Sequence, residues 1–265
     1  MEQLIGRAAR DLVKSKYAIA LTGAGISTES GIRDYRGPQG VWTLNPEAER
    51  RAYRGYQEFI QDPKGWWENI LASPRADSLG DLGKAMPNVG HYALAELEEM
   101  GIIKCTITQN VDALHEKAGT RNLLEYHGSV AKFRCLSCGS RFRRNEFDLQ
   151  KLMEENQLPP RCPKCRGIIK TDGVFFGEPI PSDVAEKSLE EAWKCDLMLI
   201  CGTSAVVYPF ANLPRIAKQR REVTIIEVNA EPTPLTEEGI SDYLIQGKIG
   251  EILPRILEEV KKLQG

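Results

Sequence analysis

Short runs of apolar residues alternate along the chain with longer segments in which apolar residues recur at helical spacing. The short runs predict buried strands at residues 17–21, 102–108, 197–201, 223–228 and 243–246. The longer segments predict helices near residues 2–15, 89–100, 183–194, 208–220 and 250–262. Strands that alternate with helices in this way form a parallel sheet covered on both faces. The pattern therefore predicts an α/β fold with a doubly wound, Rossmann-like parallel sheet.

Two stretches of the sequence do not follow this alternation, and each falls between predicted strands, as an insertion would. Residues 38–87 are rich in aromatic residues and contain five prolines, which predicts a set of short helices. Residues 133–171 hold four of the seven cysteines. We therefore expect one Rossmann-like domain made of residues 1–37, 88–132 and 172–265, and a smaller domain made of the two insertions.

The composition is that of an ordinary globular protein, with 265 residues, 42% hydrophobic and 27% charged. No apolar stretch approaches the ~20 residues needed to span a bilayer, and the start of the chain lacks the apolar core of a signal peptide. We therefore expect a cytoplasmic protein without a membrane partner. The net charge of −2 is unevenly spread, because residues 131–170 hold ten Lys or Arg against four Asp or Glu.

The segment that follows the first predicted strand has the composition of a dinucleotide-binding turn. Residues 22–25, TGAG, carry no side chain large enough to hold a phosphate away from backbone N–H groups. The match to the G-x-G-x-x-G fingerprint is partial, because Thr28 takes the place of the third glycine. A tight turn that needs glycine at positive φ explains the pattern equally well. The turn therefore favours nucleotide binding without establishing it.

Three other predicted strands end in small or polar residues. QNVD (residues 109–112), GTS (residues 202–204) and Asn229 each follow a strand. Because the carboxyl ends of parallel strands meet at one edge of a sheet, we expect these residues to line a ligand crevice. Amide and carboxylate groups there can hold a carboxamide or a ribose. A helix N-cap role explains Asn110 or Asp112 equally well.

Four cysteines form two C-x2-C pairs separated by twenty-three residues: Cys135, Cys138, Cys162 and Cys165. In a chain without an export signal this spacing is typical of a metal site and not of disulfides. Four thiolates give zinc a closed tetrahedral shell, which predicts one structural zinc ion. The alternative is four free thiols in similar turns. The long spacer indicates a small helix at residues 146–155, and no other core is expected to support this module.

Three histidines are candidates for a general base. His91 lies at the predicted start of a helix, where a capping or packing role is expected. His115 follows Asp112 by three residues and suits either a surface position or a ligand contact. His127 lies in a turn that enters the cysteine module, where an imidazole can face a cleft between domains. The residues alone rank His127 and His115 almost equally.

Seven segments occur in the same order as in the sirtuins and together cover nearly the whole chain. They are GAGISTESGIRDYRG (23–37), TQNVDALHEKAG (108–119), YHG (126–128), the paired C-x2-C motifs, VFFGE (174–178), GTSAVVYP (202–209) and EVN (227–229). No single segment decides the matter, but the ordered set does. The chain thus resembles the sirtuin family of NAD-dependent protein lysine deacylases, whose fold combines a Rossmann-like domain with a smaller zinc-bearing domain.

The resemblance implies a site for NAD, which these enzymes consume as a co-substrate. The residues implied for it are Gly23, Ala24, Gly25, Asp34, Tyr35, Arg36, Gln109, Asn110, Asp112, Gly202, Thr203, Ser204, Asn229 and Lys248. Asn110 and Asp112 would orient the nicotinamide carboxamide, and His127 would be the catalytic base. An acylated peptide would bind as an extended strand between strands at residues 177–178 and 206–207. The residues implied to contact it are Val174, Phe176, Gly177, Glu178 and Val207.

The implied reaction removes an acyl group from a protein lysine and gives nicotinamide, O-acyl-ADP-ribose and free lysine. The acyl oxygen would attack the ribose carbon that loses nicotinamide, and His127 would then deprotonate a ribose hydroxyl that takes the acyl group. Residues 38–87 lack the Tyr-x-x-Arg pair of relatives that prefer acidic acyl groups, so a neutral acyl group is expected. An apolar run there is either core or the lining of a channel for longer acyl chains: Phe59, Ile60, Trp66, Trp67, Ile70 and Leu71.

Three other interpretations fit part of the sequence. An NAD-dependent oxidoreductase would need a strand ending in an acidic residue about twenty residues after the glycines, and residues 38–50 predict no strand. A zinc-ribbon module that binds nucleic acid would use the basic residues around the cysteines, but it leaves the glycine turn and QNVD unexplained. A protein mono-ADP-ribosyltransferase would share the same site. The basic module also makes chromatin or other nucleic-acid-associated proteins candidate substrates.

Overall fold

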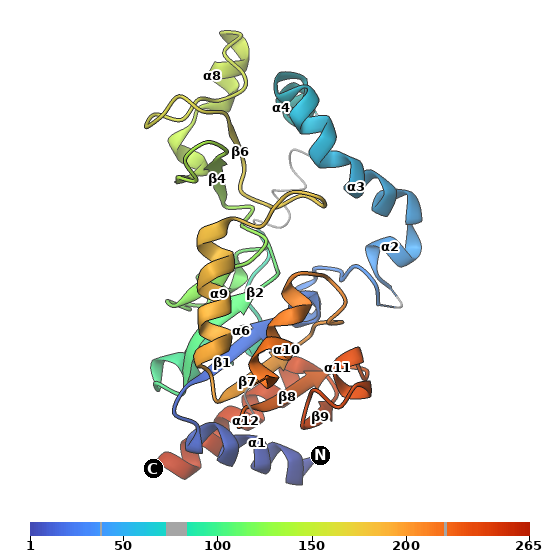
Figure 1. Ribbon diagram of the computed structural model, residues 1–265, viewed down its shortest axis with the longest axis vertical. Helices are drawn as coiled ribbons and strands as arrows, with labels where there is room; N and C mark the ends of the chain where they lie inside the picture. The colour runs from blue at the N-terminus through green and yellow to red at the C-terminus, as the bar shows by residue number, and fades with distance from the viewer. Residues whose placement is uncertain (38, 73–83, 220–221) are drawn as a thin grey trace.

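Six parallel strands form the main sheet, in the order β3-β2-β1-β7-β8-β9 (Figure 1). The computed structural model describes residues 1–37, 39–72, 84–219 and 222–265. The strands are β1 (Ala18–Thr22), β2 (Ile103–Thr108), β3 (Leu123–Glu125), β7 (Leu197–Cys201), β8 (Thr224–Asn229) and β9 (Tyr243–Gln246). The strand order reverses between β1 and β7, which is where open α/β sheets bind ligands. This architecture confirms the Rossmann-like fold.

Helices cover both faces of this sheet because each has one apolar face to bury. One face carries α1 (Glu2–Lys14), α6 (Val89–Glu99) and α12 (Ile249–Gln264), and the other carries α9 (Ser182–Lys194) and α10 (Leu213–Lys218). Four of the five helices agree with the predicted ranges to within two residues. The range 208–220 instead contains a 3-10 turn, η4 (Phe210–Asn212), followed by α10, and its last residue lies outside the described residues.

The strand register brings the carboxyl ends of the strands to one edge. Thr22 pairs with both Thr108 and Cys201, and Cys201 pairs with Val228. The segments that follow these strands therefore start side by side, which confirms the expected convergence of the glycine turn, QNVD and GTS. A further helix, α11 (Pro234–Glu237), follows β8. No helix within the described residues is long and apolar enough to cross a membrane.

The cysteine module is built on a second sheet of three antiparallel strands, in the order β5-β4-β6. The strands are β4 (Lys132–Cys135), β5 (Arg141–Arg143) and β6 (Ile169–Thr171). Between the two cysteine pairs lie a 3-10 turn, η3 (Arg144–Glu146), and the expected small helix, α8 (Leu149–Glu154). Neither this sheet nor β3 was predicted, because strands of three or four residues are too short for an apolar period to be recognised.

The two insertions share one hydrophobic core at the upper end of Figure 1. The first insertion contains α2 (Val41–Leu44), α3 (Pro46–Gln61) and α4 (Pro63–Ala72). Its Phe59 and Trp67 pack against Phe133 and Phe142 of the cysteine module, and the indole N–H of Trp67 donates to the carbonyl of Ile169 at 3.0 Å. The expectation that no core except the metal supports the module is therefore wrong. Residues 38 and 73–83 of this insertion lie outside the described residues, and the predicted domain limits stay predictions.

Candidate active site

A cleft of about 1110 Å³ lies where the carboxyl edge of the main sheet faces the first insertion and residues 174–180. This volume exceeds the ~300–1,000 Å³ of typical small-molecule sites, so the cleft has room for a dinucleotide and a second substrate. Most of the predicted site residues line it: Ala24, Gly25, Asp34, Tyr35, Arg36, Gln109, Asn110, His127, Val174, Phe176, Gly177, Glu178, Gly202, Thr203, Ser204, Val207, Asn229 and Lys248. Of the residues predicted for catalysis, cofactor or peptide, only Gly23 and Asp112 do not.

The glycine turn packs directly against the turn that follows β7. Gly25 N–H donates to the carbonyl of Gly202 at 2.8 Å, and a Cβ on Gly25 would lie only 2.7 Å from Gly202 Cα. A Cβ on Gly23 would lie 2.4 Å from Gln109 Nε2. Gly23 has φ −132°, and Gly25 is not among the glycines at positive φ. Close approach of two strand-end turns therefore requires these glycines, and the alternative of a left-handed backbone is wrong.

The chain leaves this turn as a 3-10 helix, η1 (Ala24–Ser30). On the neighbouring strand end, Asn110 Nδ2 donates to the carbonyl of Gly23 at 3.0 Å and to Ser27 Oγ at 3.2 Å. Because both amide hydrogens are used in this way, the Oδ1 atom of Asn110 is the one available to a ligand. Gln109 Nε2 donates to Thr203 Oγ1 at 2.7 Å and so joins this wall to the turn after β7.

Asp112 lies beneath the cleft and is only 5% exposed. Its Oδ2 atom accepts a hydrogen bond from Ser27 Oγ at 2.6 Å, and its Oδ1 atom accepts one from Leu114 N–H at 2.9 Å. The second bond spans two residues just before α7 (Leu114–Lys117), whose N-cap is Ala113 without a side-chain cap bond, so the N-cap alternative is wrong for Asp112. Ser27 links Asp112 to the cleft residue Asn110, and direct contact of Asp112 with a cofactor stays a prediction.

The structure separates the three histidines. His91 is buried and its Nδ1 atom accepts from Asn88 N–H at 3.3 Å, in agreement with the expected capping role. His115 is also buried, with Nε2 2.9 Å from Thr22 Oγ1, so the expectation of a surface or ligand position is wrong. Burial lowers the pKa of His91 to about 4 and that of His115 to about 3. Of the three, only His127 lines the cleft.

His127 is held in one orientation by the backbone of Gln109. Its Nδ1 atom lies 3.1 Å from the Gln109 carbonyl oxygen, and the ring lies beside Phe210. A carbonyl can only accept, so Nδ1 carries the proton and Nε2 carries the lone pair. Burial lowers the pKa of His127, and the Gln109 carbonyl partly opposes this shift. The imidazole is therefore neutral at pH 7 and able to take a proton.

Aromatic side chains also line the cleft, among them Tyr35, Trp42 and Phe176. The ring centroids of Tyr35 and Trp42 are 4.8 Å apart, those of Trp42 and Phe176 5.3 Å, and those of Tyr53 and Phe176 4.6 Å. Trp42 was not among the predicted site residues, nor was Val111, which also lines the cleft. The aromatic content of the first insertion was the available signal, but helical spacing alone could not show which aromatic residues face a ligand.

A second cavity of about 830 Å³ adjoins the first and shares lining residues with it. The shared residues are Tyr35, Val111, Val174 and Phe175. Two members of the apolar run of the first insertion, Trp66 and Ile70, also line the second cavity. Phe59 and Trp67 are fully buried in the shared core instead. The core alternative therefore holds for Phe59 and Trp67, while a channel for acyl chains at Trp66 and Ile70 stays a prediction.

The two segments expected to pair with a peptide both border the cleft, but neither forms a strand. Residues 177–178 lie in a turn with Gly177 at φ 80°, and residues 206–207 are irregular. The Glu178 side chain is 4% exposed and pairs with Arg134 and Lys170. Its carboxylate is thus directed into the protein, and only the backbone there is available to a peptide.

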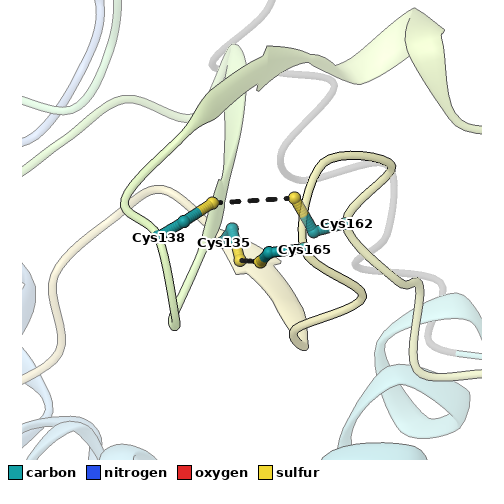
Figure 2. A group of neighbouring side chains, drawn as sticks. All are labelled: Cys135, Cys138, Cys162 and Cys165. Carbon is teal, nitrogen blue, oxygen red and sulfur yellow. Dashed lines mark hydrogen bonds between the residues drawn. The ribbon is translucent and has the colours of Figure 1, made fainter.

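The four predicted metal ligands lie together (Figure 2). The Sγ atoms of Cys135 and Cys165 are 3.5 Å apart, those of Cys138 and Cys162 are 3.7 Å apart, and all four lie within 4.8 Å of one another. A tetrahedral site with Zn–S bonds of ~2.3 Å places sulfur atoms about 3.8 Å apart. The cluster therefore fits one structural zinc ion. None of these cysteines lines either cavity.

The family model described as "Sir2 family" matches residues 23–209 of this chain. This chain is a member of the Sir2 family. It is 45% identical to the NAD-dependent protein deacylase 2 of Archaeoglobus fulgidus, and the match covers 100% of this chain and 99% of that one. The resemblance to sirtuins is thereby confirmed.

Two solved Sir2 structures are similar to this Sir2-family chain over nearly its whole length. One, described as Sir2Af2 bound to a myristoylated histone peptide, is 40% identical with a TM-score of 0.68 and covers 100% of this chain and 99% of its own. The other, of a Sir2 protein with a deacetylated p53 peptide and 3′-O-acetyl ADP ribose, is 30% identical with a TM-score of 0.75. That match covers 96% of this chain and 98% of the other.

Proposed function

We propose that this chain removes acetyl or longer neutral acyl groups from protein lysine side chains and consumes NAD. The products are nicotinamide, O-acyl-ADP-ribose and free lysine. The observation that carries this proposal is a neutral imidazole, His127, held by the Gln109 carbonyl in a cleft at the switch point of the sheet. The relative from Archaeoglobus fulgidus is an NAD-dependent protein deacylase, and the two similar structures hold peptides.

The residues of the cleft suit the two halves of the dinucleotide. Ala24 and Gly25 border the cleft without a side chain that would hold a phosphate away, and Arg36 offers a cation for the pyrophosphate. Thr203, Ser204 and Asn229 lie at the ends of β7 and β8 and would hold the adenosine half. The remaining cofactor residues of the sequence prediction border the same cleft, apart from Gly23 and Asp112.

The reaction requires orientation of the carboxamide and a base near the sugar. When bound, NAD supplies the ribose carbon that the acyl oxygen attacks as nicotinamide leaves. Asn110 has its amide hydrogens tied to Gly23 and Ser27, so it would present Oδ1 to the carboxamide. Nε2 of His127 would take the proton of a ribose hydroxyl as that hydroxyl accepts the acyl group. The aromatic wall of Tyr35, Trp42 and Phe176 would exclude water.

The second cavity supports acyl chains longer than acetyl. It shares Val111 and Val174 with the cleft, and Trp66 and Ile70 add apolar lining that the cleft does not have. An extended chain buried there would gain about 0.8 kcal/mol per methylene. A myristoylated peptide occupies one of the similar structures.

Nucleic-acid-associated proteins are proposed as substrates on the basis of charge. Arg143, Arg161, Lys164 and Arg166 are exposed on the cysteine module, and no carboxylate among the described residues forms an ion pair with them. Cations of this kind bind phosphate backbones in a salt-dependent manner. We expect an acetylated DNA-binding protein to be deacylated faster on duplex DNA than free, and an R161Q/R166Q variant to lose this difference. Equal rates with and without DNA would contradict the proposal.

A cytoplasmic location is proposed as well. Four thiols that bind zinc stay reduced in a compartment with a glutathione pool. Fractionation of the source cells with detection of the chain tests this, and recovery of the chain outside the cytoplasmic fraction would contradict it.

The deciding experiment mixes the protein with NAD and an acetyl-lysine peptide and identifies every product by mass spectrometry. We expect nicotinamide, O-acetyl-ADP-ribose and deacetylated peptide in equal amounts, without NADH. An ADP-ribosylated protein with unchanged acetyl-lysine would indicate the mono-ADP-ribosyltransferase instead. NADH would indicate an oxidoreductase, an interpretation already weakened because residues 41–61 form α2 and α3 and no strand.

A further inference from the structure

The part of the cleft wall at residues 173–177 has no regular secondary structure. It follows β6 and supplies Val174, Phe175, Phe176 and Gly177 to the cleft. Two backbone hydrogen bonds attach it locally. Val174 N–H donates to the carbonyl of His127 at 2.8 Å, and Glu178 N–H donates to the carbonyl of Phe175 at 3.0 Å. A segment with so few backbone bonds depends on side chains at its ends for its shape.

Glu178 directly follows this segment, and its carboxylate pairs with two residues of the cysteine module. Its Oε1 atom accepts from Arg134 Nη2 at 2.5 Å, and its Oε2 atom lies 3.2 Å from Lys170 Nζ. The same Oε2 atom accepts from Phe175 N–H at 2.9 Å. The carboxylate therefore joins β4 and β6 to the middle of the segment.

Lys170 lies in β6, three residues before the segment, and its side chain is fully buried. Its ammonium group donates to the carbonyls of Thr171 at 2.7 Å and Gly173 at 2.5 Å, and the Glu178 carboxylate takes the third donor. The group also lies 4.5 Å from the centroid of the Phe175 ring. Burial lowers the pKa of Lys170 to about 8, so the side chain is still mainly charged at pH 7.

A second carboxylate, that of Asp172, pairs with arginines just before the segment. Asp172 is fully buried, with Oδ1 3.3 Å from Arg134 Nε and 3.2 Å from Arg141 Nε, and its Oδ2 atom accepts from Ser129 N–H at 3.1 Å. A buried ion that has lost its partner strongly destabilises the structure around it. Removal of one charge should therefore displace the segment that this network supports.

We propose that Lys170 and Glu178 are positioning residues whose buried ion pair holds residues 173–177 in the shape that binds the acylated peptide. This inference rests on the proposed function. Lys170 lines neither cavity, so it acts only through the segment. The proposed NAD contacts lie within residues 23–36, at the ends of β2, β7 and β8 and at Lys248, and the ion pair touches none of them. Peptide binding and NAD binding should therefore respond differently to its loss.

The test compares Lys170→Met, Lys170→Arg and a matched control, Lys218→Met. Lys218 also pairs with a carboxylate, Asp242 at 2.7 Å, and donates to a backbone carbonyl, but it lines neither cavity. We expect Lys170→Met to raise KM for an acetyl-lysine peptide about tenfold, while KM for NAD and the Kd for ADP-ribose stay unchanged. Lys170→Arg should restore most of the peptide affinity. The control should alter none of these three constants.

An unchanged peptide KM in folded Lys170→Met would overturn the proposal, as would an equal loss of ADP-ribose affinity. If Lys170→Met does not fold, Glu178→Gln is tested by the same comparison of KM for the peptide with Kd for ADP-ribose. The amide keeps the shape of the side chain and can still accept from Phe175 N–H. Absence of O-acetyl-ADP-ribose with the unaltered protein would be a failure of the proposed function. Calorimetric titration of the peptide into the unaltered and variant proteins would then decide this inference separately.

Discussion

The backbone carbonyl of Gln109 lies 3.1 Å from Nδ1 of His127, while the Gln109 side chain donates to Thr203 2.7 Å away. One residue at the end of β2 thus sets the tautomer of the proposed base and joins it to the turn after β7. Because the bond to His127 comes from the backbone, the orientation of the ring depends on the position of the strand end and not on a particular side chain.

Replacement of His127 by alanine should remove the proposed base without loss of the fold. We expect kcat for deacylation to fall by about 10²–10⁴-fold, while the Kd for ADP-ribose and the melting temperature stay close to their original values. His115→Gln serves as the control, because His115 is buried beside Thr22 and lines neither cavity. It should lower the melting temperature and keep most of the activity. Substantial turnover by His127→Ala would show that another group is the base.

The pH profile should report the lowered pKa of His127. The base must be neutral, and burial places its pKa below the usual value of about 6.5. As pH falls, kcat should therefore remain high through pH 6.5 and decline only in more acidic solution. Initial rates at saturating substrates between pH 5 and pH 8 measure the midpoint. A midpoint near or above 7 would mean that His127 is not the group that titrates.

Loss of one zinc ligand should release the metal and destabilise the smaller domain. Cys162→Ala removes a ligand whose Sγ atom lies 3.7 Å from that of Cys138. We expect less than one zinc per chain and a stability loss on the order of several kcal/mol, because metal binding contributes to folding. The shared core of Phe59, Trp67 and Phe133 should leave some residual structure.

The matched variant for the zinc experiment is Cys105→Ala. Cys105 is a buried free thiol in β2, outside the four-cysteine cluster. The Cys105→Ala variant should keep one zinc ion per chain, as measured by mass spectrometry of the metal content. Equal melting temperatures for Cys162→Ala and the unaltered protein, with the metal shown to be absent, would contradict a structural role.

Filling the second cavity should change the preference for acyl length. Ile70→Trp places a larger side chain in that cavity, and we expect the ratio of kcat/KM for a decanoyl peptide over an acetyl peptide to fall about tenfold. Ile60→Trp is the control, because Ile60 is 48% exposed and lines neither cavity. An unchanged ratio for Ile70→Trp would place long acyl chains elsewhere.

The central strands of the main sheet were predictable because they are buried on both faces. Runs such as residues 197–201 are apolar throughout, and all five residues of β7 are buried. The zinc ligands were predictable because two residues between the cysteines of each pair allow both thiolates to bind the same ion. β3 and the sheet of the cysteine module were not, because their three or four residues combine apolar and charged side chains, as in Lys132–Cys135.

The two histidines show where sequence alone was insufficient. His115 follows the QNVD strand end and His127 lies in a turn that enters the cysteine module, and the residues alone ranked the two almost equally as a base. The fold places His115 against Thr22 in the interior and His127 on the cleft wall. The same holds for Glu178, whose motif suggested a peptide contact but whose carboxylate pairs with Arg134 and Lys170 inside the protein.

By itself, the sequence determined the fold class, the family, the four metal ligands and the strand ends at which a ligand would bind, because each depends on local spacing or on an apolar period. Tertiary structure alone decided which polar side chains face the cleft and which are buried, and that the two insertions share a core. Those outcomes depend on contacts between residues far apart in the chain, such as Trp67 with Ile169 and Arg134 with Glu178, and no local pattern encodes such contacts.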